Sequence, residues 1–152
     1  MEKQPNSRLC FVCGVENPVG LHLKFYETSA GEIKAEFSAP EQYQGYPGVL
    51  HGGIVASILD EAAGRAFMGI SPPRFMFTAK LEVRYRKNVP VKQLLKIVGR
   101  TIKDKGRRAE GWAGIFNADG ILLAEANVLL LDVPDPMGPI DFKALGWKVY
   151  PD

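Results

Sequence analysis

The chain has 152 residues, of which 46% are hydrophobic and 24% are charged, a composition that excludes a disordered protein and favours one globular domain. Its 19 Lys and Arg against 17 Asp and Glu leave a net charge of +2, far from the basic excess of a dedicated nucleic-acid-binding protein. No apolar run reaches the roughly 18–20 residues of a membrane span, and the first residues lack the apolar core of a secretory signal, so we expect a cytoplasmic protein with neither a nucleic-acid nor a membrane partner.

The first third of the chain predicts a lead-in followed by a hairpin. Residues 1–19 are rich in turn formers and have no hydrophobic period, which indicates an irregular segment. Apolar and polar residues alternate over 21–27 and again over 33–37, which predicts two strands joined by a turn at 30–31. The following stretch, 42–48, contains two Gly and one Pro and is expected to be a loop.

One long helix is predicted next. Between Gly53 and Phe67 apolar residues recur at helical spacing, and Gly69 follows the last of them. The helix has few polar side chains, so most of its circumference is apolar and we expect other structure to surround it. These polar residues are Ser57, Asp60, Glu61 and Arg65.

Downstream, the period-two alternation of strands appears in four segments: 77–85, 95–103, 108–117 and 121–131. Turn-forming residues separate them, and consecutive strands joined by tight turns pair in an antiparallel sheet. In the first segment the alternation places Leu81 and Val83 on one face and Thr78 on the other. The last twenty residues contain four prolines and are expected to form an extended tail or a short docked segment.

Asp60 is the first candidate for chemistry. On a helix it shares a face with small residues, because Ala56, Ala63 and Gly64 lie three or four positions away. An Asp and a Gly one turn apart both weaken a helix, so their presence indicates the close approach of a ligand or a backbone. A solvated Asp60 is the alternative. Glu61, in contrast, has the i,i+4 spacing for an exposed ion pair on the same helix.

The helix is preceded by His51-Gly52-Gly53. Two glycines allow a sharp turn and leave the first N–H groups of the helix uncovered at the positive end of its macrodipole. Such donors form an oxyanion site. His51 is a candidate to hydrogen-bond an acyl carbonyl or to hold the loop, and a helix-start turn with a purely structural His is the alternative.

Basic side chains follow the helix. Lys80, Arg84 and Arg86 occupy one side of the next predicted strand, where they are candidates to bind the phosphates of a nucleotide-bearing substrate. The alternative is the solvated face of a sheet.

Cys10 and Cys13 have the spacing of a zinc knuckle, with His22 as a third candidate ligand. A structural zinc site needs four ligands, so we expect no metal and a tight turn with two reduced thiols. The sequence contains no Gly-x-Ser-x-Gly elbow, phosphate loop or dinucleotide fingerprint.

The segment from Gly48 to Asp60, together with the order of two strands, one helix and four strands, resembles the hotdog-fold acyl-CoA thioesterases, in particular the PaaI-like and 4-hydroxybenzoyl-CoA thioesterases. The resemblance covers about residues 10–132. It implies an α+β hotdog fold, in which a curved antiparallel sheet of about six strands surrounds one long central helix. It implies a lead-in at 1–19, a thioesterase domain at 20–132 and a tail at 133–152.

The resemblance also implies an assembly and roles for residues. Two subunits would join their sheets edge to edge, as a homodimer or a homotetramer, with the site at their interface. Asp60 would be the general base or nucleophile, Gly52 would polarise the thioester carbonyl through its N–H, and His51 would position the thioester. Thr78 would reach the carboxylate from the partner subunit. The expected substrate-binding residues are Gly53, Gln44, Lys80, Arg84 and Arg86, with Gln44 beside the position where many relatives carry Asn or Gln.

The predicted function is therefore hydrolysis of an acyl-CoA to a free acid and CoA, without a cofactor. A non-catalytic acyl-CoA sensor of the same fold is the main alternative. A hotdog dehydratase and a protein-interaction module rank below it.

Overall fold

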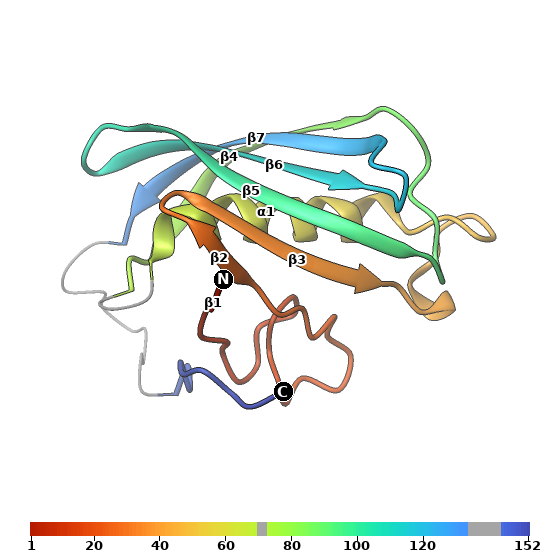
Figure 1. Ribbon diagram of the computed structural model, residues 1–152, viewed down its shortest axis with the longest axis horizontal. Coiled ribbons are helices and arrows are strands. Elements are labelled where there is room, and N and C mark those ends of the chain that lie inside the picture. The colour runs from red at the N-terminus through yellow and green to blue at the C-terminus, as the bar shows by residue number, and fades with distance from the viewer. Residues whose placement is uncertain (70–72, 134–143) are drawn as a thin grey trace.

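The computed structural model describes residues 1–69, 73–133 and 144–152. One α-helix lies against a curved antiparallel sheet of seven strands in the order β1-β2-β3-β5-β6-β7-β4 (Figure 1), which confirms the predicted fold. The strand beyond the predicted six is β1, a two-residue segment at the N-terminus that is too short to show a period in the sequence. The elements are β1 (Glu2–Lys3), β2 (Tyr26–Ser29), β3 (Glu32–Ser38), a 3-10 turn η1 (Glu41–Tyr43), α1 (Gly52–Met68), β4 (Met76–Tyr85), β5 (Leu94–Asp104), β6 (Arg108–Phe116) and β7 (Leu122–Asp132).

The predicted first strand is wrong in its bounds. It was expected over 21–27, but β2 begins only at Tyr26. The preceding residues hydrogen-bond to the lead-in instead, because the N–H groups of Leu21 and Leu23 donate to the carbonyls of Phe11 and Val12. Both leucines are buried, so the alternation located the inward side chains correctly although the hydrogen-bonding partner is not the sheet.

The predicted pairing of consecutive strands fails at β4. This strand pairs with β7 and forms one edge of the sheet, while β5 pairs with β3. The connection from β4 to β5 is not a tight turn, since its backbone binds the segment that precedes the helix: Leu50 N–H donates to Val89 O, and Val49 pairs with Pro90.

A β-bulge in β4 corrects the predicted facing of Thr78. Thr78 pairs with Leu130 and Lys80 with Leu129, so Ala79 is an extra residue between them. A bulge shifts the alternation by one position. Thr78 therefore points toward α1, on the same side as Leu81, rather than on the opposite side.

The helix lies directly on the sheet. A Cβ atom added to Gly99 of β5 would lie 2.1 Å from the carbonyl oxygen of Ala62, so only glycine allows this approach. The helix side chains that face the sheet are fully buried, among them Ile58, Leu59 and Ala62. This agrees with the predicted apolar circumference of α1.

The lead-in covers the side of α1 that the sheet leaves open (Figure 1). Arg65 fixes it there, since this side chain is 1% exposed and donates from Nη1 to the carbonyl of Pro5. Its guanidinium lies between the rings of Phe25 and Trp147, 4.7 and 4.8 Å from their centroids. The N- and C-terminal segments therefore meet around one helical side chain.

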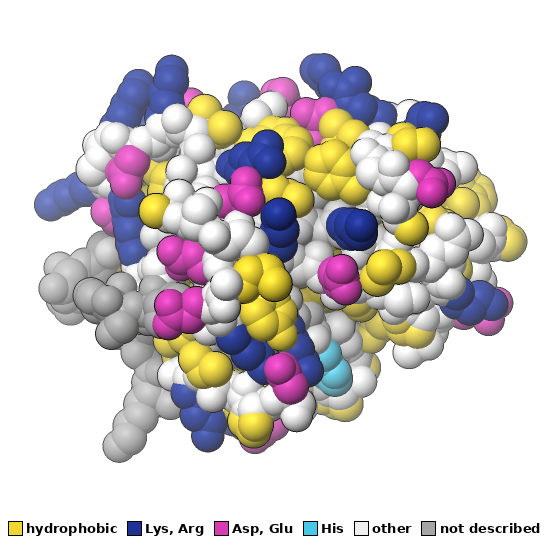
Figure 2. All heavy atoms as spheres, viewed as in Figure 1, with side chains coloured by type: hydrophobic (Ala, Val, Ile, Leu, Met, Phe, Trp, Pro, Cys, Tyr) yellow, Lys and Arg dark blue, Asp and Glu magenta, His cyan; other side chains and the backbone are white. Residues whose placement is uncertain are grey.

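The visible surface has mixed charge. On the face shown in Figure 2, Lys and Arg side chains lie among Asp, Glu and hydrophobic side chains rather than in one continuous basic area. Within the described residues, no helix combines the length and hydropathy that a membrane span requires.

Candidate functional site

His51 is the N-cap of α1. Its Nδ1 atom accepts a hydrogen bond of 2.9 Å from the N–H of Gly53, so Nδ1 carries no proton and the neutral ring is protonated on Nε2. The N–H of Gly53, expected to be free, is therefore occupied. Those of Ile54 and Val55 donate to the carbonyl of His51. In the described part of the chain, no acceptor contacts the N–H of Gly52, which leaves this exposed amide as the free donor at the helix start.

Gly52 lines a cavity of about 620 Å³, which we name the helix-start cavity. Its wall is formed by the loop before α1 and by the end of β4 with the residues that follow it, including Arg86 and Lys87. Tyr85 also lines it and donates from its hydroxyl to the carbonyl of Gly52 at 2.5 Å. The sequence did not single out Tyr85, because alternation placed it among the apolar side chains of its strand.

Asp60 lies about two turns further along α1 and is half-buried. Thr78 Oγ1 donates to Asp60 Oδ1 at 2.6 Å, so the structure brings these two predicted residues together. The contact forms within one chain, whereas the resemblance implied a Thr from the partner subunit. Burial raises the pKa of Asp60 above its usual range, the Thr78 hydrogen bond opposes this, and the neighbouring Glu61 charge adds to it.

Asp60 borders a second cavity of about 120 Å³, which we name the Asp60 cavity. Its wall includes Met68, Arg74 and Thr78. Arg74 makes ion pairs with Asp104 and Asp132, at 2.7 and 2.8 Å, and sequence patterns did not identify it. Among the described residues, none lines both this cavity and the helix-start cavity.

The Gly52 amide and Asp60 are therefore separate within one chain. They are eight positions apart on α1, which corresponds to ~12 Å along the helix axis. A reacting atom must lie ~3 Å from both the oxyanion donor and the base or nucleophile. One chain does not place its own Asp60 beside its own helix start.

Of the other predicted binding residues, only Arg86 lines one of these two cavities. Gln44 accepts a hydrogen bond of 3.0 Å from the N–H of Gly48, so it closes the loop that leads to the helix. Lys80 and Arg84 are exposed along β4, with Lys80 4.0 Å from the carboxylate of Glu82. These three residues are absent from the described walls of both cavities, whereas Arg86 lines the helix-start cavity and pairs with Glu125.

The two cysteines lie against the other side of α1. A hydrogen bond from the Cys13 thiol lowers the pKa of Cys10 to about 7, while that bond and burial raise the pKa of Cys13. His22, the candidate third ligand, contacts the carbonyl of Asn17 through its ring. The predicted ion pair of Glu61 with Arg65 forms at 3.0 Å, but the Arg65 side chain is buried rather than exposed.

Comparison with known proteins gives consistent results. The family model described as thioesterase superfamily matches residues 47–124. The chain is 29% identical over 140 residues to a protein from Rattus norvegicus described as acyl-coenzyme A thioesterase THEM4 and 28% identical to that of Mus musculus; each match spans 91% of this chain but only 60% of the relative.

Solved structures show the same fold. A crystal structure described as a thioesterase superfamily protein is 28% identical, with a TM-score of 0.75 over 82% of this chain and 63% of the other. A Streptococcus mutans protein crystallised with acetyl-CoA is 19% identical, with a TM-score of 0.67 over 78% of this chain and 94% of the other. The second likeness concerns the fold alone.

Proposed function

Because the chain belongs to the thioesterase superfamily, we propose that it hydrolyses an acyl-CoA thioester to a carboxylic acid and CoA, through its domain at 20–132. The observation that carries this proposal is the free N–H of Gly52 at the exposed start of α1, in a residue that lines a cavity of about 620 Å³. A backbone donor at the positive end of a helix stabilises the negative charge that develops on a thioester carbonyl oxygen. His51 supports this donor by capping the helix, which holds the first turn in place.

Hydrolysis also needs a base or a nucleophile, and we assign this role to Asp60. Its carboxylate either takes a proton from the attacking water or attacks the carbonyl carbon itself, and both routes give the same acid and thiol. Partial burial raises its pKa, which makes it a stronger base than an exposed Asp. The hydroxyl of Thr78 holds one carboxylate oxygen and leaves the other for the reaction.

A complete site on this account requires two chains. β4 is an edge strand of ten residues whose side chains are mostly exposed, including Phe77 at 47% and Tyr85 at 52%. Such an edge is a template for pairing with another strand. Thr78 near one end of β4 contacts Asp60, and Tyr85 at the other end contacts Gly52.

Symmetry then joins the two halves of the site. If two copies pair their β4 edges about a two-fold axis, the strands run antiparallel and each end of one β4 meets the opposite end of the other. Asp60 of one chain would then approach the helix start of its partner. We propose a homodimer, alone or within a tetramer, with two such shared sites.

The CoA part of the substrate fits the charge at the helix-start cavity. Arg86 and Lys87 line it, and these side chains can bind phosphate groups by charge-assisted hydrogen bonds. The structurally similar Streptococcus mutans protein was crystallised with acetyl-CoA, which supports a CoA ester as the ligand.

The test is a panel of acyl-CoA esters, short and medium aliphatic and aromatic, assayed by release of free thiol. We expect saturable hydrolysis of at least one class, with the free acid and CoA formed in equal amounts. Saturable binding of acyl-CoA without thiol release would instead identify a sensor protein. The absence of both binding and hydrolysis across the whole panel would contradict the proposal.

A further inference from the structure

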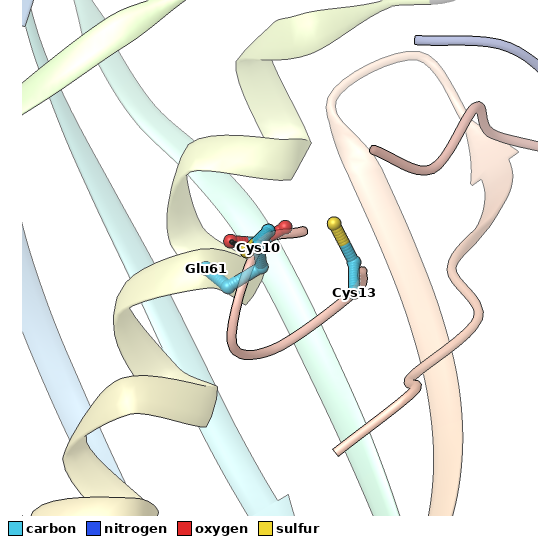
Figure 3. A group of neighbouring side chains, drawn as sticks. All are labelled: Cys10, Cys13 and Glu61. Atoms are coloured by element: carbon cyan, nitrogen blue, oxygen red, sulfur yellow. Dashed lines mark hydrogen bonds between the residues drawn. The ribbon is translucent and has the colours of Figure 1, made fainter. Parts of the chain in front are cut away.

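A group of possible metal ligands lies where the lead-in contacts α1. Cys10 and Cys13 belong to the lead-in, and Glu61 belongs to the helix. One ligand atom from each of these residues lies within 4.8 Å of the others. Figure 3 shows the loop of residues 10–13 against the helix, with Cys10 next to Glu61. The sequence could not reveal this third ligand, because Glu61 is about fifty residues from the cysteines.

One of the three spacings matches the edge of a tetrahedral metal site, and the other two are no longer than 4.8 Å. For Zn²⁺ with sulfur at ~2.3 Å and oxygen at ~2.1 Å, the ligand atoms are separated by ~3.6–3.8 Å along the edges of the tetrahedron. Cys10 Sγ and Glu61 Oε2 are 3.7 Å apart. Cys13 Sγ also contacts Ser7 Oγ at 3.5 Å, so its sulfur already has a fixed neighbour.

The surroundings orient the ligands. Glu61 Oε1 accepts a hydrogen bond of 3.0 Å from Arg65 Nε, and its Oε2 atom lies next to the Cys10 thiol, so the two oxygens face different partners. Metal-binding carboxylates are commonly held in this way by a second hydrogen bond. The main-chain N–H of Val12 approaches the Cys10 sulfur at 3.4 Å, which further restricts that side chain.

The charges also favour a divalent cation. Two thiolates and one carboxylate carry three negative charges, which a divalent ion and the buried Arg65 guanidinium neutralise. A disulfide between the cysteines would leave the converging Glu61 oxygen without a role.

We propose that Cys10, Cys13 and Glu61 bind one Zn²⁺ ion, with water as the fourth ligand in place of the fourth protein ligand that the sequence lacks, and that the ion fastens the lead-in to α1. Thiolate ligands select zinc over magnesium or calcium, and zinc adds no redox chemistry. Because Glu61 follows Asp60 directly, the ion would restrain the helix turn that carries the proposed catalytic carboxylate.

The test measures metal content and metal coordination in the full chain. After purification with a non-chelating reductant and dialysis into metal-free buffer, elemental analysis should find about one zinc per chain. Replacement by Co²⁺ should produce thiolate-to-metal charge-transfer absorption and the intense visible bands of tetrahedral cobalt. Removing zinc with a chelator should lower the melting temperature by ~5 °C or more, as expected when a tightly bound ligand leaves.

Variants identify the ligands. The double change Cys10→Ser with Cys13→Ser should abolish zinc binding, and Glu61→Gln should weaken it by at least ~10-fold, the effect of losing even an outer partner. His22→Asn is the matched control and should bind zinc as the unmodified chain does; Asn suits this position because His22 has φ of 55°.

Three results would overturn the proposal. They are a reduced chain that binds no zinc, a cobalt complex without thiolate charge transfer, and purified protein that holds a Cys10–Cys13 disulfide and takes up no metal after reduction. The cobalt spectrum decides the matter even if the cysteine variants fail to fold.

Discussion

Replacing Asp60 by Asn should lower kcat for acyl-CoA hydrolysis by about 10²–10⁴-fold, the contribution that a positioned acid or base makes. The amide neither accepts the proton of the attacking water nor acts as a nucleophile. Its side-chain oxygen still accepts the hydrogen bond from Thr78, so the local structure should persist. Steady-state kinetics on the best substrate of the panel measures the effect.

The same variant should not lose stability. Burial raises the folded-state pKa of Asp60 above its unfolded value, so the associated stabilisation is present below the unfolded pKa and is lost as the pH rises through the folded pKa. Above that pH the ionised carboxylate opposes folding, and the Asn variant should melt at least as high as the unmodified chain. Asp119→Asn, at an exposed turn, is the control and should change neither property.

The pH dependence follows from the same group. Only the ionised form of Asp60 is active, so kcat/KM should rise with pH through an apparent pKa above the usual Asp range.

Turnover by the Asn variant within two-fold of the unmodified chain would contradict the assigned role of Asp60.

Replacing Gly52 by Pro should lower kcat by about 10²–10³-fold, because proline lacks the N–H that we assign to the oxyanion. The fold should tolerate this change, since Gly52 is the first helical residue, where proline is favoured. His51 precedes it with φ of −55° and ψ of 134°, a conformation that a residue before proline adopts readily. An added Cβ atom has no neighbour closer than Tyr85 Oη, at 3.4 Å.

Gly52→Ala is the matched control for this variant. It adds the same Cβ atom but keeps the N–H, so it should retain most of the activity. Equal loss in both variants would attribute the effect to the side chain rather than to the amide. Full activity in the Pro variant would contradict the oxyanion role of Gly52.

The helix and its start could be predicted because their signals are local. Apolar spacing gave α1 to within one residue at each end, and Gly52 at the helix start followed from general rules of helix termini. The capping role of His51 was less accessible. The His51 side chain accepts a hydrogen bond from the N–H of Gly53, whereas the two adjacent glycines in the sequence suggested that this N–H would be free.

The features that escaped prediction depend on contacts that are distant in sequence. The bulge at Ala79 changes the facing of Thr78 without any local sign, and only pairing with β7 reveals it. The lead-in replaces part of a strand because Leu21 and Leu23 find backbone partners there. Helix geometry alone gives the distance between Gly52 and Asp60, but that they line separate cavities required coordinates.

The central claim is that a working site combines the Gly52 amide of one chain with Asp60 of another, and mixed oligomers of two inactive variants test it directly. Chains carrying Asp60→Asn and chains carrying Gly52→Pro are given different tags, combined, and purified through both tags. In each mixed dimer one site would hold both substitutions and the other neither, so activity should return to about half that of the unmodified dimer. Mixed dimers no more active than either parent would contradict the account.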